Sequence, residues 1–348
     1  MSNLISENES LPRNCTFEEA DWKILAQHWY PVALSREVTG APIAAKLLDE
    51  PLVIYRLGEE IIIANDLCPH RGVPLSMGKF NGEGITCAYH GLQFGKAGKC
   101  THIPANPDRN IPEKLHLKTY PVIEMYGLVW TCLNPGINDS STICPMPFWD
   151  DPDFQQITCP WIDIYGFAGR QIEGFLDVAH FGFVHTATFG DSNNTVVPPY
   201  NAVHHSTGFE VDYWSTVGNY PIGVSGIGKP GFNWLRRFNM HLPFTATLIV
   251  HFPDDKKLVI MNAASPVSAK VTRLFAPIGR NFDKELPIQD VYDFNKKVFE
   301  EDKAIVEVQK PECLPLDPRM EAHITADRSS IAYRKGLRDM GLSRFFIS

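Results

Sequence analysis

The 348-residue sequence contains no run of about 20 apolar residues, the length that a membrane-spanning helix needs. Residues 1–13 are polar and lack a positively charged start followed by an apolar stretch, so we expect no secretory signal. Eight cysteines are too few for a secreted fold held together by disulfides. We therefore expect a cytoplasmic protein whose cysteines are thiols or metal ligands.

An excess of positive charge is also missing. The chain has 32 Lys and Arg against 40 Asp and Glu, a net charge of −8, which argues against binding to nucleic acid or to an anionic membrane. No glycine-rich dinucleotide fingerprint is evident in the sequence. Hydrophobic residues make up 44% of the chain, which is ordinary for a globular protein, and the length fits two domains.

The first domain is expected at residues 22–134, after a polar leader at residues 1–21. Its short apolar runs alternate with glycine, proline and polar turns, a spacing that predicts an antiparallel β domain. Residues 135–160 contain five prolines and little periodicity, which predicts a linker on the surface.

The second domain is expected at residues 161–348 and combines both kinds of pattern. Helical stretches are predicted at about 170–184, 287–309 and 326–340. Strand-like runs lie between the first two helices, at 207–217, 245–252, 257–264 and 270–278. The chain is therefore predicted to be α+β, with an all-β domain followed by a sheet with helices.

Two short segments of the β domain each offer one thiol and one imidazole. They are Cys68-Pro-His70 and Cys87-Ala-Tyr-His90, each in a turn between strands. A structural zinc site is the alternative, but zinc fingers and ribbons usually pair Cys with Cys and His with His along the chain. In a Rieske 2Fe-2S centre, two cysteines hold one iron and two histidines hold the other, and this sequence resembles that pattern closely.

The two loops lack the extra cysteines of respiratory Rieske proteins, which form a disulfide between the loops. Val73 and Tyr89 occupy those positions. The loops therefore resemble those of Rieske oxygenases and their ferredoxins. A ferredoxin would be about a third of this length, so the second domain needs its own explanation.

The second domain carries a further group of possible metal ligands, with Asp177 three residues before His180 and His185 five residues after it. Five residues turn an ideal helix by about 500°, or 140° net, so both rings can meet one ion only if the helix bends. Gly182 permits a bend there. The alternative is that both histidines are core residues, but an acid beside two histidines favours a metal.

A third ligand is expected from the predicted helix at 287–309. Asp302 falls on a stripe with steps of three or four residues that also contains Val291, Phe294, Val298, Ile305 and Gln309. A carboxylate on a buried face must be paired or bound to metal. Glu300 and Glu301 point elsewhere on the helix, and we predict that both form a solvated acidic surface.

Together the three motifs, in this order, resemble the catalytic subunit of the Rieske non-haem iron oxygenases across nearly the whole chain. The resemblance implies a helix-grip-like second domain with a curved antiparallel sheet. It implies that Cys68, His70, Cys87 and His90 hold a 2Fe-2S cluster. It also implies that His180, His185 and Asp302 hold a mononuclear Fe(II).

The family also implies a role for Asp177 that is not metal binding. There its counterpart is a bridge that accepts hydrogen bonds from the iron histidine matching His180 and from the cluster histidine matching His90 of a neighbouring subunit. Electrons then cross between chains. The resemblance therefore implies a homotrimer that receives electrons from a separate reductase or ferredoxin.

Phrases such as Tyr126-Gly-Leu-Val-Trp130 and Tyr333-Arg334 resemble the monooxygenase branch. That branch includes demethylases of vanillate, dicamba and methylxanthines and hydroxylases of the saxitoxin pathway. Three departures affect packing and polarity rather than ligands. Gly174 and Leu92 replace a frequent asparagine and a frequent tryptophan, and Gly336 replaces another tryptophan.

The implied activity is O2-dependent hydroxylation of a C–H bond of a small organic substrate, with electrons from an NAD(P)H-dependent reductase. Plain hydroxylation, possible for a saxitoxin-like alkaloid, and oxidative O- or N-demethylation would share one mechanism. A cis-dihydroxylating dioxygenase and a non-enzymatic electron-transfer protein are the alternatives. Tyr200, Trp214 and Asn262 are expected to be packing residues rather than substrate contacts.

Overall fold

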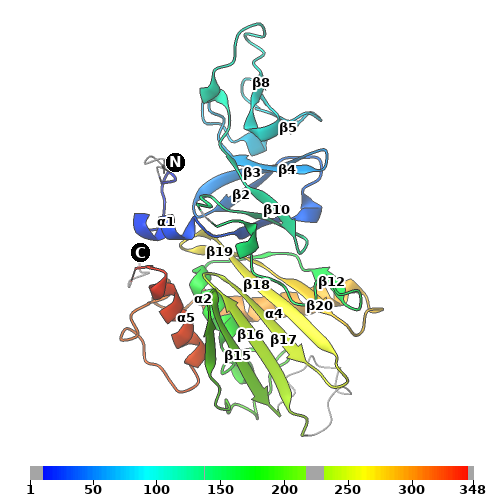
Figure 1. Cartoon of the computed structure of the whole chain (residues 1–348), viewed down its shortest axis with the longest axis vertical. Helices are drawn as coiled ribbons and strands as arrows, with labels where there is room; N and C mark the ends of the chain where they lie inside the picture. The colour runs from blue at the N-terminus through cyan, green and yellow to red at the C-terminus, as the bar shows by residue number, and fades with distance from the viewer. Residues whose placement is uncertain (1–10, 137, 217–230, 344–348) are drawn as a thin grey trace.

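The computed structural model of the chain describes residues 11–136, 138–216 and 231–343 (Figure 1). The N-terminal domain lies above the C-terminal domain, which is the one expected to be catalytic, and contains helix α1 (Glu19–Leu25). Its described strands form three antiparallel sheets. They are β1 (Tyr30–Leu34), β11 (Leu128–Thr131) and β10 (Val122–Met125); β2 (Ile43–Leu47), β3 (Glu50–Leu57), β4 (Glu60–Asn65) and β9 (Thr119–Tyr120); and β5 (Lys79–Phe80), β6 (Ile85–Thr86), β7 (Gln93–Phe94) and β8 (Cys100–His102).

The catalytic domain is built on a nine-stranded antiparallel sheet. Its order is β12-β20-β18-β17-β16-β15-β14, and β19 pairs with both β13 and β18. The strands are β12 (Gln155–Thr158), β13 (Ile162–Ile164), β14 (Ala202–His205), β15 (Gly208–Ser215), β16 (Trp234–His241), β17 (Thr245–His251), β18 (Lys257–Ser268), β19 (Val271–Phe275) and β20 (Pro277–Arg280). The helices are α2 (Ala168–Leu176), α3 (Phe181–Val184), α4 (Ile288–Val306) and α5 (Arg328–Asp339).

The predicted α+β class is confirmed, and the differences from the predicted elements have local causes. Strand β16 was not predicted, although its residues alternate strictly between buried and half-buried, because two adjacent arginines, Arg236 and Arg237, interrupt its apolar pattern. Strand β12 lies within the expected linker and pairs with β20. His204 and His205 are exposed residues of strand β14.

One hydrophobic cluster joins the two domains. It contains Trp22 and Leu48 from the first domain and Phe167, Phe244 and Tyr333 from the second. The backbone N–H of Leu48 donates to the carbonyl of Pro266, 2.7 Å away. The two domains therefore share a core, which fixes the Rieske-like loops relative to the catalytic sheet.

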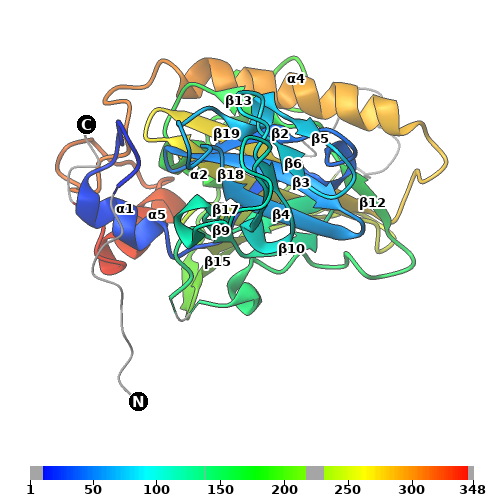
Figure 2. The same cartoon turned by 90° about the horizontal axis from the view of Figure 1, so that it is seen from above.

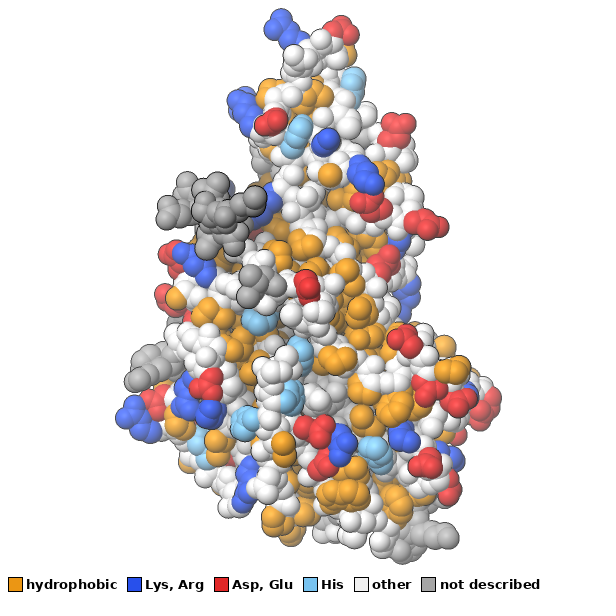
Figure 3. Space-filling view, viewed as in Figure 1, with side chains coloured by type: hydrophobic (Ala, Val, Ile, Leu, Met, Phe, Trp, Pro, Cys, Tyr) orange, Lys and Arg blue, Asp and Glu red, His pale blue; other side chains and the backbone are white. Residues whose placement is uncertain are grey.

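The helices that position the site lie on different sides of this framework. Viewed from above, α4 runs along one side of the molecule, and α1 and α5 lie together at one end (Figure 2). Asp21 in α1 accepts hydrogen bonds from the backbone N–H and the hydroxyl of Ser343, which follows α5. On the face in Figure 3, charges of both signs are interspersed over the two domains. Among the described residues, no helix has the length and apolar character needed to cross a membrane.

Candidate metal centres

The two Cys-His loops have the same backbone construction. The N–H of Cys68 donates to the carbonyl five residues further on at 2.9 Å, and the N–H of Cys87 does the same at 2.8 Å. In each loop the fourth residue after the cysteine is a glycine with a left-handed backbone, Gly72 at φ 68° and Gly91 at φ 69°. Only glycine adopts this conformation without steric cost, so each loop turns back on its cysteine.

The four side chains of these loops fit a cluster with two kinds of ligand. Cys68 and Cys87 are both 3% exposed, and burial raises the pKa of the Cys68 thiol to about 11 when no metal is bound. The rings of His70 and His90 lie edge to face with centroids 4.5 Å apart, and the buried Nδ1 of His70 has no partner among the described residues. A buried ring nitrogen without a partner is unusual and fits a metal ligand.

The predicted helix at 170–184 is broken, and the break is what brings the two histidines of the catalytic domain together. Helix α2 ends at Leu176, and α3 begins directly after His180 and ends before His185. The Nε2 atoms of the two rings face each other at 3.1 Å. The bend therefore lies before His180 rather than at Gly182, the position suggested from the sequence. At Gly182 a Cβ atom would lie 3.0 Å from the carbonyl oxygen of Asp191, so this glycine allows a close loop contact.

Asp302 completes the group from helix α4. Its Oδ1 lies 3.0 Å from Nε2 of His185 and 3.6 Å from Nε2 of His180. One ligand atom from each of the three residues lies within 4.8 Å of the others. This set of two imidazoles and one carboxylate matches the facial triad of non-haem iron sites, which leaves other coordination positions open.

The electrostatics of the metal-free group also point to a cation. Burial lowers the pKa of His180, but hydrogen bonds with Asp177 and Asp302 outweigh burial and raise the pKa to about 9. Burial raises the pKa of Asp302, whereas hydrogen bonds from the two histidines lower it below its ordinary value. Two imidazole nitrogens at 3.1 Å repel each other unless a proton or a metal ion lies between them. The group therefore suits a bound cation.

The buried stripe of α4 differs from the predicted one by about one position. Asn295, Phe299 and Val306 are buried, whereas Ile305, a member of the predicted stripe, is 46% exposed. Phe299 and Val306 pack in a hydrophobic cluster with strands of the catalytic sheet. Asp302 lies three residues after Phe299 and four before Val306, so it faces inward as predicted.

The prediction that Glu301 belongs to a solvated surface is wrong. Its Oε2 accepts hydrogen bonds from Nδ1 of His185 and from the hydroxyl of Thr188, each at 2.7 Å. The prediction is correct for Glu300, whose side chain is 54% exposed and lies 3.8 Å from Lys296. Sequence periodicity missed Glu301 because its partners come from the loop after α3, whose path is not encoded in α4.

Asp177 lies at the C-terminal end of α2, next to the three clustered residues. Its Oδ2 accepts from Nδ1 of His180 at 3.0 Å, and its Oδ1 accepts from the N–H of Ala179 at 2.8 Å. Burial raises the pKa of the Asp177 carboxyl. The hydrogen bond from His180, together with smaller effects, outweighs burial and lowers this pKa below its ordinary value. The bond to Nδ1 leaves Nε2 of His180 free to bind a metal, which is the usual arrangement of a metal-binding histidine.

A buried ion network holds α2, α5 and the preceding loop together, and it was not predicted. Arg334 forms two hydrogen bonds with Glu173, at 2.6 and 2.9 Å, and a third with Glu321 at 2.6 Å. Arg170 also donates to Glu321 at 2.6 Å. Both arginine side chains are at most 6% exposed. The network fixes the helix whose end carries Asp177.

The three departures from relatives are accommodated in different ways. Leu92 is 2% exposed and packs in the core of the Rieske-like loops. A Cβ atom on Gly336 would lie 2.8 Å from Leu242, so α5 packs closely at this position. A Cβ atom on Gly174 would meet no described atom within 4 Å. Leu92 and Gly336 therefore affect packing, as expected, whereas Gly174 leaves open space beside it.

Tyr200, Trp214 and Asn262 differ in their exposure and in their hydrogen bonds. Tyr200 is buried, and its hydroxyl bonds with Ser329 at 3.1 Å and with the carbonyl of Ala326, which indicates packing as expected. Trp214 is 48% exposed on β15. Asn262 is 3% exposed, and its Oδ1 has no partner among the described residues.

Comparisons with known proteins agree with this arrangement. The model of the Rieske [2Fe-2S] domain matches residues 28–121, and the model of the vanillate O-demethylase oxygenase C-terminal domain matches residues 168–342. Methylxanthine N1-demethylase NdmA of Pseudomonas putida is 32% identical, with 91% of this chain and 89% of NdmA covered. Methylxanthine N3-demethylase NdmB of the same organism is 30% identical, with 93% and 91% covered.

Solved structures have the same fold. The structure of Pseudomonas putida CBB5 NdmA with caffeine has a TM-score of 0.79 and 30% identity, and the match covers 91% of each chain. Dicamba monooxygenase bound to dicamba also has a TM-score of 0.79, at 19% identity, with 91% of this chain and 97% of that chain covered. The chain thus combines a Rieske 2Fe-2S domain with an oxygenase domain that has a His-His-Asp site for mononuclear iron, and it belongs to the Rieske non-haem iron oxygenases, in the branch that contains the vanillate, dicamba and methylxanthine demethylases.

Proposed function

We propose that this enzyme is a monooxygenase that removes a methyl group from nitrogen or oxygen of a small heterocyclic or aromatic substrate. The observation that carries the proposal is the cluster of His180, His185 and Asp302, whose ligand atoms lie within 4.8 Å of one another. N-Demethylation is favoured because NdmA and NdmB are similar over more than nine-tenths of this chain. Hydroxylation without loss of a methyl group, as for a saxitoxin-like alkaloid, is the second candidate, since it needs the same site.

The ligand assignment is part of this proposal. Cys68 and Cys87 would hold one iron of the cluster, and His70 and His90 the other. His180, His185 and Asp302 would hold the mononuclear iron. When bound, the cluster supplies single electrons and the mononuclear iron activates dioxygen.

The chemistry balances with two electrons from outside the chain. R–CH3, O2, two electrons and two protons give R–CH2OH and water. When the methyl carbon is attached to nitrogen or oxygen, the hydroxymethyl product breaks into R–H and formaldehyde. The task of the protein is to hold one methyl group beside the three ligands and to keep other C–H bonds away.

We propose that Asp177 is the electron-transfer bridge between the two centres of neighbouring chains in a homotrimer. The Cys-His loops, next to β5 to β8, lie at the end of the first domain that is remote from α2 in Figure 1. His90 is exposed, and so are the apolar side chains of Leu67, Met77 and Tyr89 around the loops. Exposed apolar residues beside a redox centre favour docking against another protein surface.

The electrons would come from a separate NAD(P)H-dependent reductase or ferredoxin. No dinucleotide fingerprint is evident in the sequence, which supports a separate protein as the source of the electrons. The edge of the Cys-His loops is the natural contact for such a donor. It is used in turn by the donor and by the neighbouring chain.

The test is turnover of a substrate panel with a reductase supplied. The panel contains methoxy-aromatics, N-methyl heterocycles and guanidinium alkaloids, and products are analysed by mass spectrometry under 18O2, with formaldehyde measured in parallel. Formaldehyde in equal amount to the demethylated product is expected. Two 18O atoms in a cis-diol product would instead identify a dioxygenase, and no oxidised product with any compound would favour the electron-transfer alternative. The Asp302→Ala variant is the control for oxidation that does not involve the site.

A further inference from the structure

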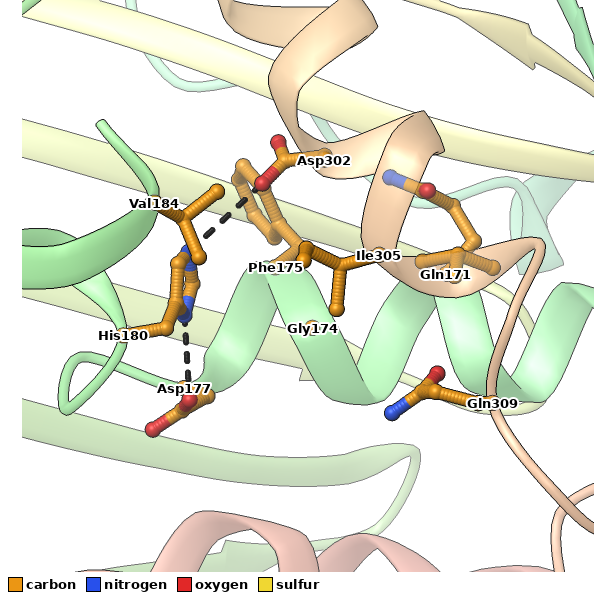
Figure 4. A pocket seen from close by; sticks show the side chains of 10 residues that line it. Gln171, Gly174, Phe175, Asp177, His180, Val184, Asp302, Ile305 and Gln309 are labelled. Carbon is orange, nitrogen blue, oxygen red and sulfur yellow. Dashed lines mark hydrogen bonds and ion pairs between the residues drawn. The ribbon is translucent and has the colours of Figure 1, made fainter. Parts of the chain in front are cut away.

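A small cavity lies between α2 and α4, directly beside the mononuclear centre (Figure 4). His180, Asp302 and Asp177 form one part of its wall, and Phe175 and Ile305 form an apolar part. The cavity volume is about 80 Å³. It has room for roughly two or three water molecules, at about 30 Å³ each.

Two buried amide groups border this cavity without a hydrogen-bond partner for their oxygens. Gln171 is 2% exposed, and neither its Oε1 nor that of Gln309 has a partner among the described residues. Both amides lie at the end of the cavity away from His180 (Figure 4). Buried amide oxygens nearly always accept a hydrogen bond, and the carboxylates of Asp177 and Asp302 are acceptors as well. The occupant must therefore donate hydrogen bonds.

A second cavity, of about 240 Å³, lies next to the first. The two share Gly174, Asp177 and Gln309 as lining residues. On the far side, the second cavity is lined by Glu321 and Asp327, and both side chains are 24% exposed. Solvent therefore reaches its outer part.

Unpartnered polar atoms are concentrated along these two cavities. Besides the two glutamine oxygens, Nε of Arg170 and Nε2 of His323 are buried without a partner, and both residues line the second cavity. The described residues contain ten buried side-chain atoms of this kind. Four of the ten thus border these two neighbouring cavities, as expected if water bonds with them.

Gly174 lines both cavities. A Cβ atom there would meet no described atom within 4 Å, and its φ angle is not in the left-handed region that favours glycine. Neither crowding nor the backbone requires glycine at this position. The missing side chain therefore leaves open space at a position that borders both cavities.

We propose that the two cavities form one water-filled passage that carries protons from solvent to the mononuclear centre. The inference rests on the proposed function, in which each hydroxylation consumes two protons and releases one water. The reductase supplies the two electrons, and solvent must supply the protons. Water bonded to Gln171 and Gln309 would link the partly exposed Glu321 and Asp327 with the edge of the site at Asp177 and Asp302.

The decisive variant is Gly174→Leu, which places a side chain in the open space that borders both cavities. We expect the cluster absorption and the iron content to stay at the wild-type level. The product formed per electron should fall by about tenfold or more, since positioned proton transfer contributes at least this much, with hydrogen peroxide accounting for the difference. Gln309→Leu should act in the same direction. Gln289→Leu is the matched control, because Gln289 is an exposed glutamine of α4, outside both cavities, and bonds with Asp293.

A second readout does not depend on catalysis. High-resolution diffraction from crystals of the wild-type protein should show ordered water bonded to Oε1 of Gln171 and Gln309, and Gly174→Leu should interrupt that chain. Dry cavities in the wild type, or an unchanged product yield in Gly174→Leu, would overturn the proposal. A raised KM with an unchanged yield per electron would also overturn it and assign the cavity to substrate. If the wild type oxidises no compound while the water is present, the failure lies with the proposed function.

Discussion

The two metal centres are built in opposite ways. Each half of the Cys-His centre is one short loop with its own backbone hydrogen bonds and its own left-handed glycine, Gly72 or Gly91. The mononuclear centre instead takes His180 and His185 from one segment and Asp302 from a helix more than a hundred residues later in the chain. A local loop can be recognised from spacing alone, whereas an assembled site depends on how distant elements pack.

The supporting residues differ in the same way. Around the Cys-His loops the hydrogen bonds come from the backbone of the loops themselves. Around the mononuclear centre they come from side chains, Asp177 to His180 and Glu301 to His185. Side-chain support can be removed one residue at a time, so mutations can separate the two centres.

The largest expected effect is that of Asp302→Ala. Loss of the carboxylate removes one of three ligands, so we expect loss of mononuclear iron and of all turnover, while the absorption of the Rieske cluster stays unchanged. Turnover, iron analysis and visible spectroscopy are measured on one preparation. Normal turnover would refute the ligand assignment, and loss of the cluster absorption would show that the two centres are not independent.

In Asp177→Asn the cluster and the mononuclear iron should both stay bound. Electron transfer between the two centres should be slowed. The amide cannot provide both the charge and the acceptors of the carboxylate that bonds with His180. We expect turnover to fall by about a hundredfold, the upper end of effects for residues that support metal ligands. Rapid mixing with substrate and O2 should show a reduced cluster that is reoxidised slowly. Reoxidation at the wild-type rate would exclude Asp177 as the bridge.

Glu301→Gln should weaken iron binding by about tenfold, the lower end of that range, because a neutral amide is a poorer acceptor for His185 and Thr188. Titration of the metal-free protein with Fe(II) measures the affinity directly. Glu300→Gln, one residue away and exposed, is the matched control and should bind iron as the wild type does. Equal affinities for all three proteins would mean that Glu301 does not orient His185.

The smallest effect on the chemistry is expected from Arg334→Met, which breaks the buried ion network. Removing Arg334 leaves the buried Glu173 with only the longer contact to Arg170, at 3.4 Å, so the free energy of unfolding should fall by about 3 kcal/mol. Denaturant unfolding at low temperature measures this change. The control is Arg319→Met, since Arg319 is 82% exposed and its loss should change stability far less. Similar losses in both variants would show that the network does not stabilise the scaffold.

The parts of the site that the sequence predicted are those with a short-range signature. The two Cys-His loops, the spacing of His180 and His185 and the inward side of Asp302 all follow from residue type and local periodicity. The fold class follows from the alternation of strand-like and helical segments, although adjacent arginines concealed β16.

The residues that were missed depend on tertiary packing. Glu301 faces His185 because the loop after α3 folds back against α4. The Arg334 network joins α2, α5 and the loop before α5, three segments that are separate in the sequence. The position of the bend before His180 depends on where α2 stops, and no glycine or proline marks that point. Periodicity within one element contains no information about its neighbours.

The central claim, that the two centres work together between chains, can be tested by complementation. A Cys68→Ser chain keeps its mononuclear site and an Asp302→Ala chain keeps its cluster, and each is expected to be inactive alone. The two chains are co-expressed in equal amounts and assemble at random into closed rings. A mononuclear site then works only when its own chain is Cys68→Ser and the neighbour that supplies its electrons is Asp302→Ala. About a quarter of the wild-type rate should therefore be recovered. Complete inactivity of the mixed assemblies, with both metals present, would contradict the account.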